Sequence, residues 1–108
     1  MPYVFVTSIF PPDTTDQLAQ IYVDTLKDVR SKLRATGKEI IANAIRATTQ
    51  GIEVIGVWDI KEGKLEEYLL IEAQAMTNYH KIEGFKYQID VRFKATEALE
   101  MIGMKMPE

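Results

Sequence analysis

The sequence predicts a single α+β domain in which a four-stranded antiparallel sheet carries two helices on one face. Three observations lead to this fold class. The chain has 108 residues, enough for one hydrophobic core. Four segments are rich in β-branched and aromatic residues, as strands are, and two others repeat apolar residues every three or four positions, as helices do. The order strand, helix, strand, strand, helix, strand then gives two right-handed crossover units joined by a hairpin.

The first strand is predicted over residues 3–10, where both alternating sets of side chains are apolar, as in a central strand. Thr14 and Gln17 have the spacing of a capping box, which would open the first helix. Apolar residues mark the buried face of this helix: Leu18, Ile21, Tyr22, Leu26, Val29 and Leu33. We expect Gly37 to end it in the left-handed conformation.

The middle of the chain predicts a hairpin, with strands over 40–49 and 52–60 and a tight turn at Gln50-Gly51. A second helix is expected from about residue 65 to residue 83, since acidic residues occupy its first turn and Gly84 follows it.

The last strand is predicted over residues 85–94, where apolar and polar residues alternate and indicate one buried and one polar face. A short helix from Glu97 to Ile102, capped by Thr96, would follow it. The whole chain, 1–108, is therefore interpreted as one domain with a short C-terminal extension over 95–108.

Helices on one side leave the second face of the sheet uncovered. On the first strand that face carries either Tyr3, Phe5 and Ile9 or Val4, Val6 and Phe10. On the third strand it carries either Ile55 and Val57 or Ile52, Val54 and Trp58. Either choice exposes more apolar surface than a small monomer normally leaves open. We therefore expect a homodimer, with two-fold symmetry as the commonest arrangement.

The strand–helix order and the length resemble the dimeric α/β-barrel superfamily, in which two ferredoxin-like βαββαβ subunits pack sheet against sheet. The resemblance covers nearly the whole chain and implies a ferredoxin-like sandwich within a dimeric α/β barrel. Members include cofactor-free monooxygenases, haem-degrading enzymes, lactone isomerases and stress-induced proteins. None of their functional residues matches a position here, so the resemblance implies a fold and no activity.

Composition excludes several classes of protein. The net charge of −3 and the pI of about 5.2 argue against a nucleic-acid partner. The absence of cysteine excludes disulfides and thiolate-held clusters, and favours the cytoplasm. No apolar stretch is long enough to span a membrane, and the N-terminus has no signal-peptide pattern.

Cofactor and metal sites are not indicated either. The glycines are isolated, so no phosphate-cradling loop is predicted. One histidine with scattered carboxylates has no ligand spacing, so we expect neither a metal nor a cofactor.

The second helix carries the candidate site. Tyr68, Met76 and Tyr79 share its apolar face, Glu72 lies near the middle of that face, and His80 lies at its edge. Burial would raise the pKa of Glu72 toward the range useful for acid–base chemistry. Alternatively, Glu72 lies at the solvent edge or pairs with Arg46, Lys86 or a lysine of the first helix. Trp58, on the third strand, is a further candidate for ligand contact or for packing.

Three functions remain open from the sequence. The first is a homodimeric small-molecule-binding or stress-type protein, with a pocket between the sheet and the second helix for an apolar or aromatic ligand. The second is a cofactor-independent enzyme, monooxygenase- or isomerase-like, with Glu72 or His80 as general base. The third is a structural or assembly module.

Overall fold

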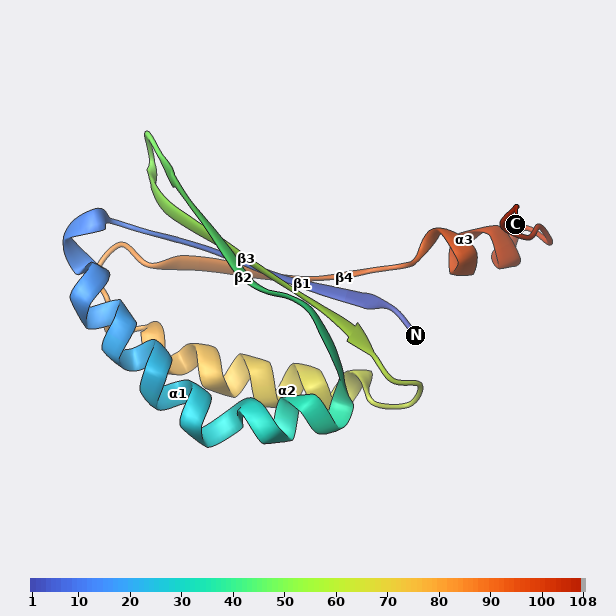
Figure 1. The fold of residues 1–108 in the computed structure, drawn as a ribbon, viewed down its shortest axis with the longest axis horizontal. Helices are drawn as coiled ribbons and strands as arrows, with labels where there is room; N and C mark the ends of the chain where they lie inside the picture. The colour runs from blue at the N-terminus through green and yellow to red at the C-terminus, as the bar shows by residue number, and fades with distance from the viewer. Residues whose placement is uncertain (108) are drawn as a thin grey trace.

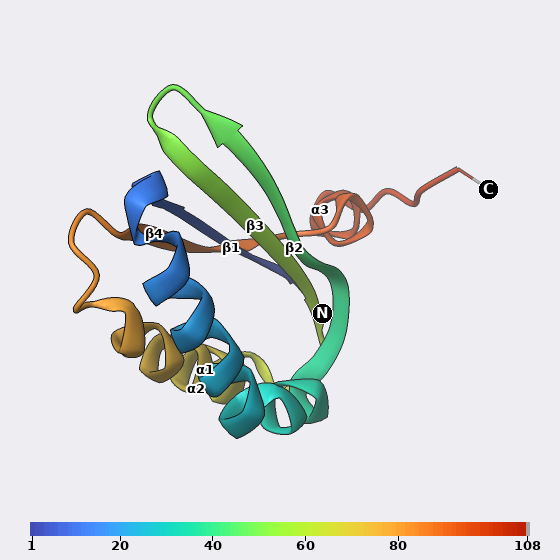
Figure 2. The ribbon, with the colours of Figure 1, turned by 60° about the vertical axis from the view of Figure 1, so that its left-hand side comes forward.

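The computed structural model describes residues 1–107 and has the predicted layers: one four-stranded sheet, with α1 and α2 side by side on one of its faces (Figures 1 and 2). Its elements are β1 (Tyr3–Phe10), α1 (Thr15–Thr36), β2 (Gly37–Thr48), β3 (Gly51–Ile60), α2 (Leu65–Met76), β4 (Lys86–Arg92) and α3 (Ala95–Met101), with 3-10 turns at Pro12–Thr14 and Thr77–Tyr79. The strand order is β2-β3-β1-β4 and all neighbours are antiparallel. The βαββαβ order predicted from the sequence is confirmed.

The register assigns each strand residue to one face of the sheet. Val4 lies opposite Trp58, and both pack with Leu33 of α1 and Tyr68 of α2. Val6 and Ile89, which are paired across β1 and β4, also face the helices. Side chains alternate along a strand, so the neighbouring residues Tyr3, Phe5 and Val57 lie on the open face.

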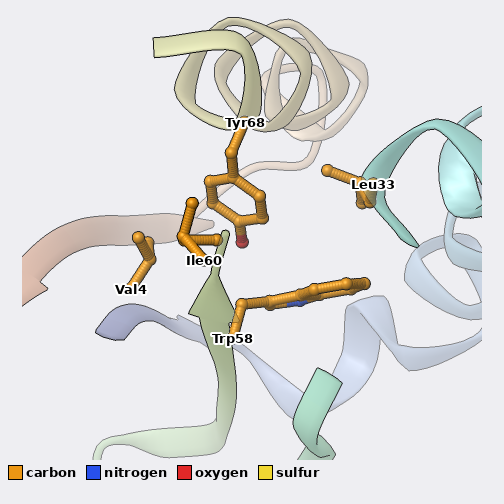
Figure 3. Packing of buried hydrophobic residues seen from close by; sticks show 5 residues of the cluster. All are labelled: Val4, Leu33, Trp58, Ile60 and Tyr68. Atoms are coloured by element: carbon orange, nitrogen blue, oxygen red, sulfur yellow. The ribbon is translucent and has the colours of Figure 1, made fainter. Parts of the chain in front are cut away.

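The best-packed part of the core lies at one end of the sheet–helix interface. Val4, Ile60 and Tyr68 have no exposed surface there. Figure 3 shows Tyr68 reaching from α2 toward Ile60 and Trp58, with Leu33 beside them. The Trp58 and Tyr68 ring centroids are 5.7 Å apart at a tilted angle. These contacts join both helices to the two central strands.

The open face of the sheet combines apolar residues with charged ones. The Arg92 guanidinium lies 4.6 Å from the centre of the Phe5 ring, and the Lys94 ammonium lies 5.1 Å from that of Tyr3. Lys94 is also paired with Asp59, with 2.8 Å between nitrogen and oxygen. These cation–π contacts cover part of the apolar surface of β1, although no second layer packs on it in the described part of the chain.

Three local predictions on α1 and β2 are wrong. The Thr14 hydroxyl makes no capping bond and donates instead to the carbonyl of Pro11, because a 3-10 turn over Pro12–Thr14 precedes α1. Gly37 is extended, with φ 178°, and passes directly from α1 into β2. Glycine is required there for space: a Cβ would lie 2.4 Å from the carbonyl oxygen of Asp59. The second strand accordingly begins at Gly37 rather than at residue 40.

The end of α2 also differs from the prediction. The α-helix ends at Met76, continues as a 3-10 turn to Tyr79, and reaches Gly84, whose φ is 81°. Tightening of the backbone places both Tyr79 and Ile82 in the core.

The edge strand β4 is less buried than its alternation predicts. Ile89 is half-buried, whereas Tyr87 and Val91 are 37% and 44% exposed. The pattern indicated which side chains share a face, and the position at the sheet edge limits how far that face is covered.

The C-terminal segment leaves the sheet and extends away from the helices (Figure 1). Helix α3 starts at Ala95 with Lys94 as its N-cap, two residues earlier than predicted, and has no buried residue. Its first turn is tied to the N-terminus of the chain, just before β1, by a 2.7 Å contact between Glu97 and the Met1 amine. Several large apolar side chains on this segment are exposed: Phe93, Met101, Ile102, Met104 and Met106.

Candidate functional site

A cavity of about 350 Å³ lies between the sheet and the two helices. Its walls come from α1, α2 and the inner faces of all the strands except β4, with Phe85 closing it beside that strand. Five aromatic rings line it: Phe10, Tyr22, Trp58, Tyr79 and Phe85. Aliphatic side chains such as Leu26 and Val29 complete an apolar wall. This size and lining are typical of small-molecule sites.

Small residues on the inner face make the space. Val6 lies opposite Gly56, which has no side chain, and Ser8 follows at the next inward position of β1. Ala75 of α2 faces the same region. At the packed end the equivalent positions hold Val4, Trp58 and Ile60. The hollow therefore follows from residue size along two paired strands.

Glu72 lines the cavity and is half-buried. Burial raises its pKa above the usual value for a glutamate, and the nearby carboxylate of Glu39 raises it further, while the Tyr68 hydroxyl acts in the opposite direction. A carboxyl group in this setting retains its proton to higher pH than an exposed one. Glu72 forms no ion pair among the described residues, so the predicted alternatives of pairing with Arg46, Lys86 or a lysine of α1 do not occur.

The two tyrosines predicted beside Glu72 have different positions. Tyr68 is fully buried in the packed core, and its hydroxyl is close enough to the Glu72 carboxyl to act on the pKa of that group. Tyr79 lines the cavity and stacks on Phe85 with 5.0 Å between ring centroids. Burial, as the main cause, raises the pKa of Tyr79 to about 12. Met76 and Trp58 also line the cavity, so four of the six candidates share it, and Tyr68 adjoins it through Trp58.

His80 lies outside this group. Its side chain is exposed and stacks on Tyr87, with Nε2 3.1 Å from the tyrosine hydroxyl. It does not line the cavity. A continuous α-helix would place His80 at the edge of the apolar face. The 3-10 turn after Met76 has fewer residues per turn, so His80 points elsewhere.

Asn43 is a cavity residue that the periodicity did not reveal. The register of β2 shifts twice between Glu39 and Ala44, and Asn43 adopts a positive φ of 66° in this bulged stretch. Its amide nitrogen donates to the Tyr22 hydroxyl at 2.9 Å, and its oxygen lies over Gly56, 2.7 Å from where a Cβ would be. Bulges often position a side chain for function, but the alternation of apolar and polar residues in a sequence does not predict where a bulge occurs.

Arg30 and Glu39 are two charged cavity residues that the sequence did not indicate. Both line the cavity, and an Arg30 Nη lies 3.5 Å from a Glu39 carboxylate oxygen. Glu39 lies opposite Trp58 on the inner face of β2. Its inward position follows from the start of β2 at Gly37, which the predicted boundary missed.

Metal binding finds no support in the described part of the chain. Across residues 1–107 no group of three or more histidine, aspartate or glutamate side chains is placed to hold an ion. None of the helices in that range is long and apolar enough to cross a bilayer.

Comparison with known proteins supports the fold. No protein-family model and no curated protein sequence matches the chain. A dimeric ferredoxin-like protein from an uncultured marine organism is similar in structure, with a TM-score of 0.57 over 88% of this chain and 97% of that one, at 11% identity. A second such protein reaches a TM-score of 0.47 at 13% identity, over 86% of this chain and 89% of that one. The first of these shows that the chain has the ferredoxin-like fold.

Proposed function

We propose that this protein is a homodimer that binds a small apolar or aromatic molecule between its sheet and its helices. The observation that carries the proposal is the 350 Å³ cavity, whose wall is formed by aromatic and aliphatic side chains. Close packing is the rule in protein interiors, so an apolar space of this size beside a well-packed core is unusual without an occupant.

The homodimer is supported by uncovered apolar surface at two places. The open sheet face carries the half-buried Tyr3, Phe5 and Ile55, and no second layer packs on it among residues 1–107. The C-terminal segment exposes Phe93 by 64% and Ile102 by 70%. Helices as short as α3 are marginal in water without packing partners. A second copy would cover both surfaces, and the similar ferredoxin-like protein of known structure is described as dimeric.

Fluorescence of Trp58 tests the binding proposal directly, because it is the only tryptophan and it lines the cavity. Titration with 2-acetonaphthone, a bicyclic aromatic ketone, should change the emission to saturation with one ligand per subunit. Val54→Phe, which places a ring in the cavity, should abolish the change. Leu70→Phe adds the same ring on the exposed side of α2 and should leave binding intact. Unsaturable or absent binding would contradict the proposal.

Native mass spectrometry of the purified protein tests the assembly. A dimer, with or without a retained small mass, agrees with the proposal. A monomer would contradict the sheet-burial argument, and a larger ring would favour an assembly module.

A second candidate function, a cofactor-independent enzyme with Glu72 as general base, is favoured by one observation. Glu72 is the carboxyl group in the cavity whose pKa burial raises. As a carboxylate it would remove a proton next to a ketone carbonyl, leaving an enolate, and then return a proton to the same carbon. In heavy water this exchanges the methyl protons of 2-acetonaphthone for deuterium, which proton NMR measures. Glu72→Gln should abolish the exchange, whereas Glu66→Gln, an exposed carboxyl on the same helix, should not.

A further inference from the structure

Arg30 presents a buried hydrogen-bond donor that no group in the described chain accepts. The side chain as a whole is 42% exposed, but its Nε is out of contact with water and has no partner. The guanidinium is held to Glu39 only through an Nη at 3.5 Å, the longest of the ion-pair distances together with Lys64–Glu67. Buried donors are nearly always paired, because an unpaired one loses its bond to water and gains nothing in return.

The surroundings of Arg30 indicate which kind of group would satisfy that donor. Arg30 lines the cavity together with Glu39 and Glu72. Glu72 lies in a setting where burial and the Glu39 carboxylate raise its pKa, so it is a neutral donor over a wider pH range than an exposed glutamate. The positive charge of Arg30 and the negative charge of Glu39 offset each other, and the Arg30 Nε–H remains without a partner in the described chain.

We propose that Arg30 is a ligand-binding residue, and that the ligand carries a carbonyl-type oxygen (ketone, amide or carboxylate) on an aromatic or aliphatic body. Because one long contact to Glu39 holds the guanidinium, the Arg30 side chain turns on binding so that its Nε–H donates to this oxygen. The apolar body occupies the cavity beside Trp58, Val29 and Tyr22. The proposal rests on the proposed binding function and adds the chemical class of the ligand.

An organic cation fits this cavity less well, despite its aromatic wall. An ammonium group at the polar end would lie beside the fixed charge of Arg30, and Glu39 is already paired with that charge. A hydrocarbon would occupy the apolar space but leave the Arg30 donor unpaired. The oxygen acceptor therefore distinguishes the proposed ligand from both alternatives.

The experiment compares three probes with the same ring system: 2-acetonaphthone, 2-ethylnaphthalene and 2-naphthylmethylamine. Isothermal titration and Trp58 fluorescence measure their affinities for the wild type, for Arg30→Lys and for Arg34→Lys. Arg34 is exposed on the same helix and does not line the cavity, so Arg34→Lys is the matched control. Circular dichroism verifies that each variant is folded.

The ketone should bind the wild type most tightly, and Arg30→Lys should weaken it by about tenfold, the value of one charge-assisted hydrogen bond. The same variant should change the affinity of the hydrocarbon by less than about twofold, and Arg34→Lys should change neither. Replacing the ketone by 2-naphthoate shows whether a charged oxygen is preferred.

Two results would overturn the inference while leaving the binding function intact. The first is that the amine binds the wild type most tightly. The second is that Arg30→Lys lowers the affinities of the ketone and the hydrocarbon equally, which would mean that Arg30 is purely structural. If none of the three probes binds, both the function and the inference are wrong.

Discussion

The two ends of the sheet–helix interface differ sharply, although the same strands and helices form both. At one end Val4, Ile60 and Tyr68 exclude solvent completely. At the other end the same layers enclose about 350 Å³ of space. The difference is in side-chain size: Val4 faces Trp58 in the register, whereas Val6 faces Gly56 two residues further along. The packed end holds the layers together, so the hollow end is free to be a binding site.

The largest expected loss of stability comes from a substitution at the packed end. Ile60→Ala should lower the free energy of unfolding by about 3 kcal/mol, because it removes a fully buried side chain from a close-packed cluster. Ile45→Ala, the same substitution at a cavity residue that is 68% exposed, should cost less than about 1 kcal/mol. Urea denaturation of both variants measures this difference. Equal losses would mean that the two ends are packed alike.

Two glycines allow the same comparison, because Gly37 packs against backbone and Gly56 lies beside the cavity. An alanine at Gly37 would place its Cβ against the carbonyl of Asp59, which cannot move without disrupting β3, so a loss of about 3 kcal/mol is expected. At Gly56 the Cβ would meet only the Asn43 side chain, which can swing aside into the cavity at the loss of its bond to Tyr22. Gly56→Ala should therefore cost about 1 kcal/mol in the same denaturation experiment. A greater loss at Gly56 than at Gly37 would contradict this account.

The change of melting temperature with pH tests the burial of Glu72 at the hollow end. Its pKa is raised in the folded state, so the folded protein holds this proton more tightly than the unfolded chain does. The stabilisation is complete below the unfolded pKa of glutamate and is lost as the pH rises through the folded pKa. Glu72→Gln should remove this decline in melting temperature between acid and neutral pH. Glu66→Gln should follow the wild type, and an unchanged profile in Glu72→Gln would contradict the burial of the carboxyl.

The smallest effect on the cavity is expected from removing the C-terminal segment. A chain ending at Arg92 lacks α3, which has no buried residue, so its affinity for 2-acetonaphthone should stay within about twofold of the full chain. The dimer should weaken by about tenfold or more, since the exposed Phe93 and Ile102 would no longer contact the second copy. Sedimentation velocity across a dilution series measures this. An unchanged dimer would show that α3 takes no part in it.

The regular parts of this fold were predictable because alternation and helical periodicity depend on which residues are buried. The eight residues of β1 were predicted to the residue, and Glu72, Met76 and Tyr79 were placed on one wall of the space under the sheet. Departures from regular geometry were not predictable. The bulges in β2 turn Asn43 inward, and the 3-10 turn after Met76 leaves His80 outside the cavity. Each changes the direction of a side chain in a way that regular periodicity does not include.

Arg30 could not be found from its own position, since it lies among basic residues that look like a solvated end of α1. The role proposed for it depends on Glu39, which enters the cavity only because β2 begins directly after the helix. The small inward residues Ser8 and Gly56 are a signal that was present in the sequence. Where the other inward-facing side chains of a strand are large, small residues such as these indicate a cavity.

The most direct test of the central claim, that the hollow end binds a small molecule with a carbonyl-type oxygen, is an amide NMR titration with 2-acetonaphthone. The account predicts chemical-shift changes that saturate together at cavity residues such as Tyr22, Asn43 and Glu72, with the Arg30 Nε–H signal moving downfield as it gains an acceptor. Residues of the open face, such as Thr7 and Gln88, should change little. Changes confined to the open face, or none at Arg30, would contradict it.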